Sequence, residues 1–160
     1  MKLIKMMLCA ACALSLAVAC DKSEDDSVLI PVDKTFLGEL SVDQTDGTFF
    51  RQQEVQVRYE MNTDATPVTM NIYMYRVQFA EAMPVKLDMT IPAVEFTVAD
   101  GAIELSGDGI VPLAMGGEFP QYTITDLQGR IENGRMTLSM TCGKYPLTYT
   151  GIAMYEYAVE

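Results

Sequence analysis

Apolar and polar residues alternate one by one along most of this chain after residue 34. A period of two is typical of β-strands that bury one face. The clearest stretches are residues 54–60, 68–75, 85–91, 94–98 and 136–142. Beyond the first twenty residues, no window of twelve or more carries a helical apolar period. The pattern therefore predicts an all-β domain.

Turn-forming residues separate these stretches. Asn133-Gly134 favours a type I′ hairpin turn, in which both central residues take positive φ. The alternation changes phase within residues 122–131, which predicts a β-bulge near Asp126. About eight strands at this spacing indicate a sandwich or a barrel. Consecutive hairpins favour an antiparallel up-and-down β-barrel, because closure leaves no strand edge exposed.

The beginning of the chain has a different pattern. Lysines occur early in residues 1–5, and residues 6–19 carry no charge. This uncharged run is shorter than the about 20 residues that a membrane-spanning helix needs, and it suits the apolar part of a secretory signal peptide. We therefore expect a signal peptide at residues 1–19. An ordinary secretory signal cut near Ala19 would leave Cys20 as a free thiol.

The segment Leu16-Ala17-Val18-Ala19-Cys20 resembles the lipobox of bacterial lipoproteins. In that family the signal peptide is cut before the cysteine, and the cysteine is acylated. The family pattern usually has Leu three places before the cysteine, where this chain has Ala17. The resemblance implies lipidation of Cys20 and attachment to a membrane. Two or three acyl chains make such an attachment effectively permanent.

Residues 20–33 are expected to form the lipidated cysteine and an acidic, flexible tether, and residues 34–160 a single barrel domain. The acidic run after Cys20 resembles the export signal of some lipoproteins of anaerobic Gram-negative bacteria. That signal sends them to the outer face of the outer membrane. We expect a location in the cell envelope, lipid-anchored to the outer membrane. Display on its inner or outer face stays open.

The amino-acid composition narrows the range of functions that this chain can have. The formal net charge is −11, which disfavours nucleic-acid binding because phosphate backbones are repelled. Histidine is absent, so the usual general base and a common metal ligand are missing. We expect a non-enzymatic protein with no cofactor and no metal. Paired carboxylates such as Asp25 and Asp26, or Asp43 and Asp46, could bind calcium, but their spacing favours a solvated surface. An enzyme that uses carboxylates across a cleft stays as an alternative.

Methionines stand at alternate, inward-facing positions of the predicted strands. The candidates for a ligand-binding interior are Met70, Met74, Met89, Met136 and Met140. Methionine adapts to varied shapes, and an eight-stranded barrel either is filled or holds one small ligand. These residues line a pocket or simply fill the core. The numerous tyrosines either stack on a ligand at the barrel mouth or pack along strands. Cys142 shares the apolar face of its strand and is predicted to be buried and inert.

Several segments together resemble a known family. They are residues 36–42, 73–79, 84–91, 124–131 with Asn133-Gly134 and 136–140, and 149–151. The set is similar to the calycin-like, lipocalin-like β-barrel domain of lipoproteins from anaerobic Gram-negative bacteria, over about residues 34–155. The resemblance implies a barrel and brings no catalytic residues. Lipocalins carry Gly-x-Trp near the first strand, whereas Gly38 is followed by no tryptophan.

Two functions follow from the sequence. The first is a membrane-anchored lipoprotein whose non-enzymatic barrel binds a small apolar ligand or an envelope partner. The second is a structural or interaction module of the cell envelope with a filled barrel and no ligand. An internal cavity of roughly 300 Å³ or more would favour a ligand. A filled barrel with an exposed apolar patch would favour the second function.

Overall fold

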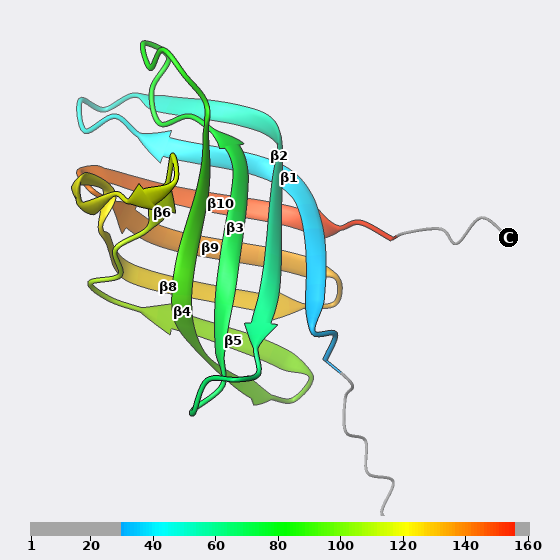
Figure 1. Ribbon diagram of the computed structural model, residues 1–160. Coiled ribbons are helices and arrows are strands. Elements are labelled where there is room, and N and C mark those ends of the chain that lie inside the picture. Colours follow the sequence, from blue (N-terminus) through cyan, green and yellow to red (C-terminus); the bar gives the residue numbers. More distant parts are fainter. Residues whose placement is uncertain (1–29, 156–160) are drawn as a thin grey trace, which may run out of the picture.

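The structure is a computed structural model that describes residues 30–155 as one closed β-barrel (Figure 1). Its wall is an antiparallel ring of 8 strands, which confirms the expected fold class. The wall strands are β1 (Asp33–Asp43), β2 (Phe49–Asn62), β3 (Thr69–Val77), β4 (Leu87–Ala99), β5 (Ala102–Gly107), β8 (Ile124–Glu132), β9 (Arg135–Cys142) and β10 (Tyr145–Ala153). The expected signal peptide, Cys20 and the tether up to residue 29 lie outside the described residues.

Each wall strand pairs with the next one along the chain, and β10 pairs with β1 to close the ring. This is the up-and-down order that the sequence favoured. The connection between β5 and β8 holds a small hairpin of β6 (Leu113–Ala114) and β7 (Gly117–Glu118), which pairs with β4. A single 3-10 turn follows at Pro120–Tyr122. Within residues 30–155, no helix is long and apolar enough to cross a bilayer.

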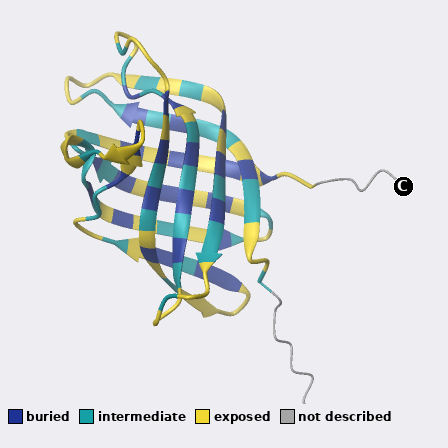
Figure 2. Ribbon diagram, in the orientation of Figure 1, coloured by how far each residue is buried: buried dark blue, intermediate teal, exposed yellow. Residues whose placement is uncertain are grey.

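The alternation of the sequence separates the interior from the outer face. Figure 2 shows bands of buried and exposed residues that alternate along the strands. Among the described residues, the buried set is apolar apart from the tyrosine hydroxyls and contains no charged side chain. Burial of apolar surface, at about 25 cal/mol per Å², is therefore the main force that holds the ring closed.

Two local features test the sequence pattern. Asn133 and Gly134 take φ of 50° and 72°, which confirms the type I′ turn. Pro92 does not end a strand, because β4 runs through it from Leu87 to Ala99. The next residue, Ala93, takes φ of 54° in an irregular part of the β3–β4 pairing. A bulge is one of the few places where a strand accepts proline, since a ladder hydrogen bond is missing there.

Three bulges are stabilised in the same way. In each, a residue with positive φ donates its backbone N–H to an Asp or Asn side chain on or beside the neighbouring strand. The pairs are Arg76 with Asp88 Oδ1 at 2.8 Å, Ala93 with Asn71 Oδ1 at 3.1 Å, and Asp126 with Asp108 Oδ1 at 3.1 Å. The side-chain oxygen takes the place of the carbonyl that the regular ladder would supply. The bulge predicted near Asp126 is thereby confirmed.

Two glycines face each other where β1 and β10 close the ring. Gly38 and Gly151 are opposite in the register. A Cβ atom on Gly38 would collide with the backbone carbonyl of Thr150. A Cβ atom on Gly151 would lie 2.7 Å from Cζ of Tyr149 and 2.8 Å from its Cε1. The missing side chains therefore allow close approach of the two strands and leave room for the Tyr149 ring.

Candidate functional site

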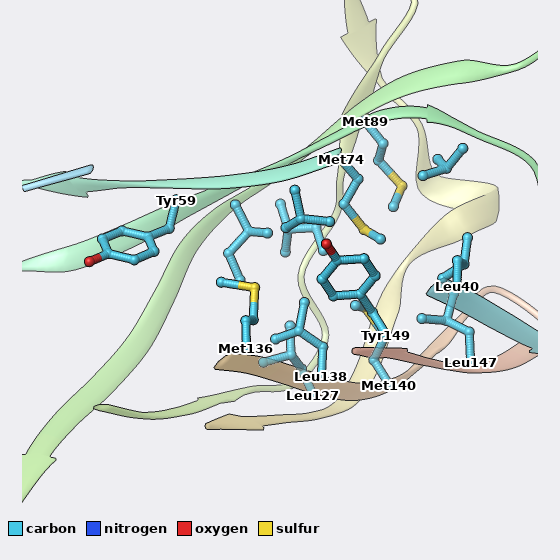
Figure 3. Close-up of a cluster of buried hydrophobic side chains, with 14 of the residues drawn as sticks. Leu40, Tyr59, Met74, Met89, Leu127, Met136, Leu138, Met140, Leu147 and Tyr149 are labelled. Atoms are coloured by element: carbon cyan, nitrogen blue, oxygen red, sulfur yellow. The ribbon is translucent and has the colours of Figure 1, made fainter. Parts of the chain in front are cut away.

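The five candidate methionines all lie inside the barrel. Each is at most 3% exposed. Met74 and Met89 are opposite each other in the β3–β4 pairing. Met136 and Met140 project into the same apolar cluster from β9, on the other wall (Figure 3). The structure thus brings together the residues that the sequence singled out.

The interior around these methionines is packed. A cavity large enough for water would expose the side chains that line it, and an empty apolar cavity is destabilising. Phe36, Val57, Met70, Ile72 and Met74 are instead 0% exposed. Side chains therefore leave no water-sized void against these residues. An eight-stranded barrel is narrow enough to be filled in this way.

Two buried tyrosines have hydroxyl groups that donate to backbone carbonyl oxygens. Tyr59 donates a hydrogen bond to the carbonyl oxygen of Pro31 at 3.0 Å, and Tyr149 donates one to that of Val55 at 3.0 Å. Burial raises the pKa of Tyr59 to about 12 and raises the pKa of Tyr149 as well. Both hydroxyls have backbone partners, so neither is left free for a ligand in the interior.

A cluster of aromatic rings closes the end of the barrel that lies away from the described chain ends. Phe79 is buried at its centre, with ring centroids 5.0 Å from Tyr122 and 6.0 Å from Tyr145. Phe119 stacks on Tyr122 at 5.1 Å. Burial raises the pKa of Tyr122, and the nearby Tyr145 contributes. The aromatic cluster separates the packed interior from the loops outside.

Outside this cluster lies a hollow of ≈ 580 Å³. Small-molecule sites span about 300–1,000 Å³. We call this hollow the loop groove. Its lining comes from the β1–β2, β3–β4 and β9–β10 connections. It includes Phe49, which is 60% exposed, together with Phe50, Glu81, Lys144 and Tyr145. The groove therefore combines aromatic rings with charges of both signs.

Hydrogen bonds hold the loops of the groove in place. Gln44 donates from Nε2 to the carbonyl oxygen of Phe79 at 2.8 Å, which ties the β1–β2 loop to the β3–β4 loop. Asp46 accepts from the side chain of Thr48 at 2.6 Å and from its backbone N–H at 2.9 Å. These bonds lower the pKa of Asp46. Lys144 Nζ lies 5.1 Å from the centroid of the Tyr145 ring.

The described carboxylates considered for calcium, Asp43 and Asp46, stabilise the β1–β2 turn instead. Asp43 accepts a hydrogen bond from the backbone N–H of Thr45 at 2.7 Å, and Asp46 is held by Thr48. Aspartates commonly stabilise turns in this way. Among residues 30–155, no three His, Cys, Asp or Glu side chains are grouped as a metal site requires. Asp25 and Asp26, the other pair considered, lie outside the described residues.

Cys142 is 0% exposed, so its predicted burial is confirmed. Its Sγ lies 3.6 Å from the carbonyl oxygen of Tyr122. Burial raises the pKa of the thiol to about 12. The reactive form of cysteine is the thiolate, so a thiol that stays protonated behind the barrel wall is chemically inert.

Sequence reasoning missed the loop groove. The one available signal was the doublet Phe49-Phe50, which breaks the alternation just after the Asp46-Gly47 turn. A turn followed by two aromatic residues does not say which other loops come near, so the groove was not predictable from that segment alone.

No family model, no curated protein and no solved structure matches this chain. The functional argument therefore depends on the barrel, its interior and its surface.

Proposed function

We propose that this chain is a lipoprotein, anchored to the outer membrane by an acylated Cys20, that presents a filled, non-enzymatic barrel to a partner in the cell envelope. The packed interior carries the filled-barrel part of this proposal. Methionines that could surround a ligand are instead in contact with other core side chains. Of the two functions open from the sequence, a filled barrel favours the interaction module over the carrier of a small apolar molecule. The calycin-like resemblance is in accord with such a barrel.

The loop groove is the surface that we assign to the partner. Its loops are held by hydrogen bonds, so little ordering is needed on binding, and preformed sites bind more tightly for that reason. Aromatic side chains are over-represented among residues that dominate binding energy, and Phe49 exposes its ring there. Lys144 and Glu81 add charges that can fix orientation.

The electrostatics of the described residues support a non-enzymatic role. The two carboxyl groups with a shifted pKa, Asp46 and Glu132, are both shifted downward, by hydrogen bonds to Thr48 and Arg130 respectively. General acids and bases that work near neutral pH need pKa values close to 7. The chain also contains no histidine that could act as a general acid or base.

The anchor and the filled interior are tested together by native mass spectrometry of the protein purified from its own envelope. We expect the mass of the chain from Cys20 onward plus its acyl groups, with no small molecule in stoichiometric amount. The Cys20→Ser variant should lack the acyl mass and leave the membrane fraction. An apolar molecule that is released only on unfolding would overturn the filled barrel and restore the ligand carrier.

The groove is tested with a photo-crosslinking amino acid placed at position 49 in living cells. Position 115 is the matched control, because Met115 is also strongly exposed but lies on the β6–β7 hairpin outside the groove. We expect a discrete crosslinked protein from position 49 and none from position 115. The same products from both positions would refute the groove as the binding surface.

A further inference from the structure

Exposed apolar side chains gather at the end of the barrel where the described chain begins and ends. Val32, Leu37, Ile152, Met154 and Tyr155 are between 40% and 69% exposed. We call these five residues the terminal patch. Leu37 and Ile152 are opposite each other in the β1–β10 pairing, with both side chains on the outer face. Exposed apolar side chains grouped at one end of a domain point to an interaction site.

Hydrogen bonding and packing hold the last residues of the patch against the barrel. The backbone N–H of Met154 donates to the carbonyl oxygen of Thr35 at 2.8 Å, which extends the β1–β10 pairing. Lys34 Nζ lies 5.6 Å from the centroid of the Tyr155 ring. Figure 1 shows β1 starting and β10 ending on the same side of the molecule. The patch is therefore formed where the two ends of the domain meet.

Two more exposed apolar residues lie at the same end of the barrel. Val68 precedes β3 in the β2–β3 turn, and Val98 is next to the last residue of β4. At this end the acidic side chains of Asp33 and Glu60 are paired with Arg58, at 2.7 and 3.4 Å. Pairing with Arg58 offsets the charge of these two carboxylates, while Asp64 and Asp100 in the β2–β3 and β4–β5 turns add negative charge at the same end. Negative charge opposes approach to an anionic lipid surface.

The short segment between Cys20 and the barrel indicates what lies against the terminal patch. Only residues 21–29 separate Cys20 from the described part, and nine residues reach roughly 30 Å at most. If Cys20 is acylated, as the proposed function requires, the terminal patch is held within this distance of the bilayer. A tyrosine with a neighbouring lysine is a common pair at the membrane–water interface, where the ring and the charged amine both find suitable surroundings.

We infer that the terminal patch rests on the lipid bilayer, so that the barrel stands in a fixed orientation with its loop groove directed away from the membrane. This inference rests on the proposed lipid anchor and adds a second, weaker contact to it. Apolar side chains of a membrane-bound domain gain by leaving water for the headgroup boundary. The acyl chains supply the attachment, and the patch supplies the orientation.

The absence of tryptophan gives a direct test, because a single introduced tryptophan is the only one in the chain. Tyr155→Trp places it in the patch. Phe49→Trp is the matched control at the opposite end, since Phe49 is 60% exposed and Tyr155 is 69% exposed. Both acylated proteins are reconstituted into phosphatidylcholine vesicles that contain lipid brominated near the headgroup end of the acyl chains. We expect blue-shifted and strongly quenched emission for Tyr155→Trp, and neither change for Phe49→Trp.

The outcomes separate the inference from the anchor on which it rests. If both proteins float with the vesicles but their tryptophans are equally unquenched, the anchor stands and the oriented contact is wrong. A blue shift without quenching by brominated lipid would assign the patch to a second copy of the chain and also overturn the inference. If the proteins do not float with the vesicles at all, the anchor fails and the oriented contact fails with it. Unchanged circular dichroism of both variants establishes that each is folded.

Discussion

Cys142 should make this fold sensitive to alkaline pH. Its thiol is buried on β9, and burial raises the pKa from 9.0 to about 12. The unfolded chain therefore releases this proton near pH 9, whereas the folded chain keeps it up to about pH 12. Because the unfolded state loses the proton first, the stability linked to this group is complete below pH 9 and is lost as the pH rises toward 12.

The size of the effect follows from the difference between the two pKa values. Each unit of difference is worth about 1.4 kcal/mol, so the full loss approaches about 4 kcal/mol at strongly alkaline pH. At pH 10 the expected loss from this thiol is about 1.4 kcal/mol. Tyr59 and Tyr149 also have raised pKa values, but from an ordinary value of 10.0, so their ionisation matters mainly above pH 10.

Urea unfolding followed by circular dichroism at pH 8 and pH 10 measures the effect. Cys142→Ala is the control, because the cavity that it creates lowers stability by the same amount at both pH values. We expect the free energy of unfolding to fall by about 1.4 kcal/mol more in the unsubstituted protein than in Cys142→Ala. Any contribution from Cys20 cancels in this difference.

Equal losses in the two proteins would refute the reasoning, since the thiol would then have the same pKa folded and unfolded. Rapid labelling of Cys142 by a thiol reagent at pH 8 in the native acylated protein would contradict it independently. Slow labelling, at a rate set by unfolding, agrees with a buried and protonated thiol.

The packed interior, one buried hydrogen bond and one exposed hydrogen bond give three further expectations, each measured by urea unfolding. Tyr149→Phe should lower stability by about 1–2 kcal/mol, because the buried carbonyl of Val55 loses its donor; no change would mean that this bond is not formed. Met74→Ala should cost about 2–5 kcal/mol, whereas Met115→Ala on the surface should stay within about 0.5 kcal/mol. A neutral Met74→Ala would point to free space in the interior. Asp108→Ala removes the acceptor of the Asp126 backbone N–H in its bulge and should lower the free energy of unfolding by about 1 kcal/mol. A variant as stable as the unsubstituted protein would contradict this.

Much of the barrel could be predicted from short stretches of sequence. Successive side chains of a strand point to opposite faces, so alternation in residues 136–142 is enough to place Met136 and Cys142 on the buried side. Asn133-Gly134 specifies its turn because few residue pairs accept two positive φ angles. The phase slip near Asp126 likewise reports a bulge, since one extra residue inverts the faces that follow.

Other features depend on partners that are distant in sequence. Proline is rarely accepted inside a strand, yet β4 continues through Pro92. The bulge at Ala93 that accommodates it is completed by Asn71, on a different strand. The Tyr149 hydroxyl finds its acceptor in Val55, 94 residues away. No local pattern identifies such pairs, because they are set by register and by closure of the ring.

The sequence by itself determined most of the strands and inward faces and the candidate residues of the interior, because these follow from the local direction of side chains. Val68, Val85 and Val98, at or just beyond strand ends, were expected on the buried face and are exposed instead. Only the tertiary structure decided whether that interior is a pocket or a core. The answer depends on the summed volume of side chains from all strands against the width of the closed barrel. The tertiary structure also assembled the loop groove and the terminal patch. Each joins segments that are far apart in the sequence and share no local signal.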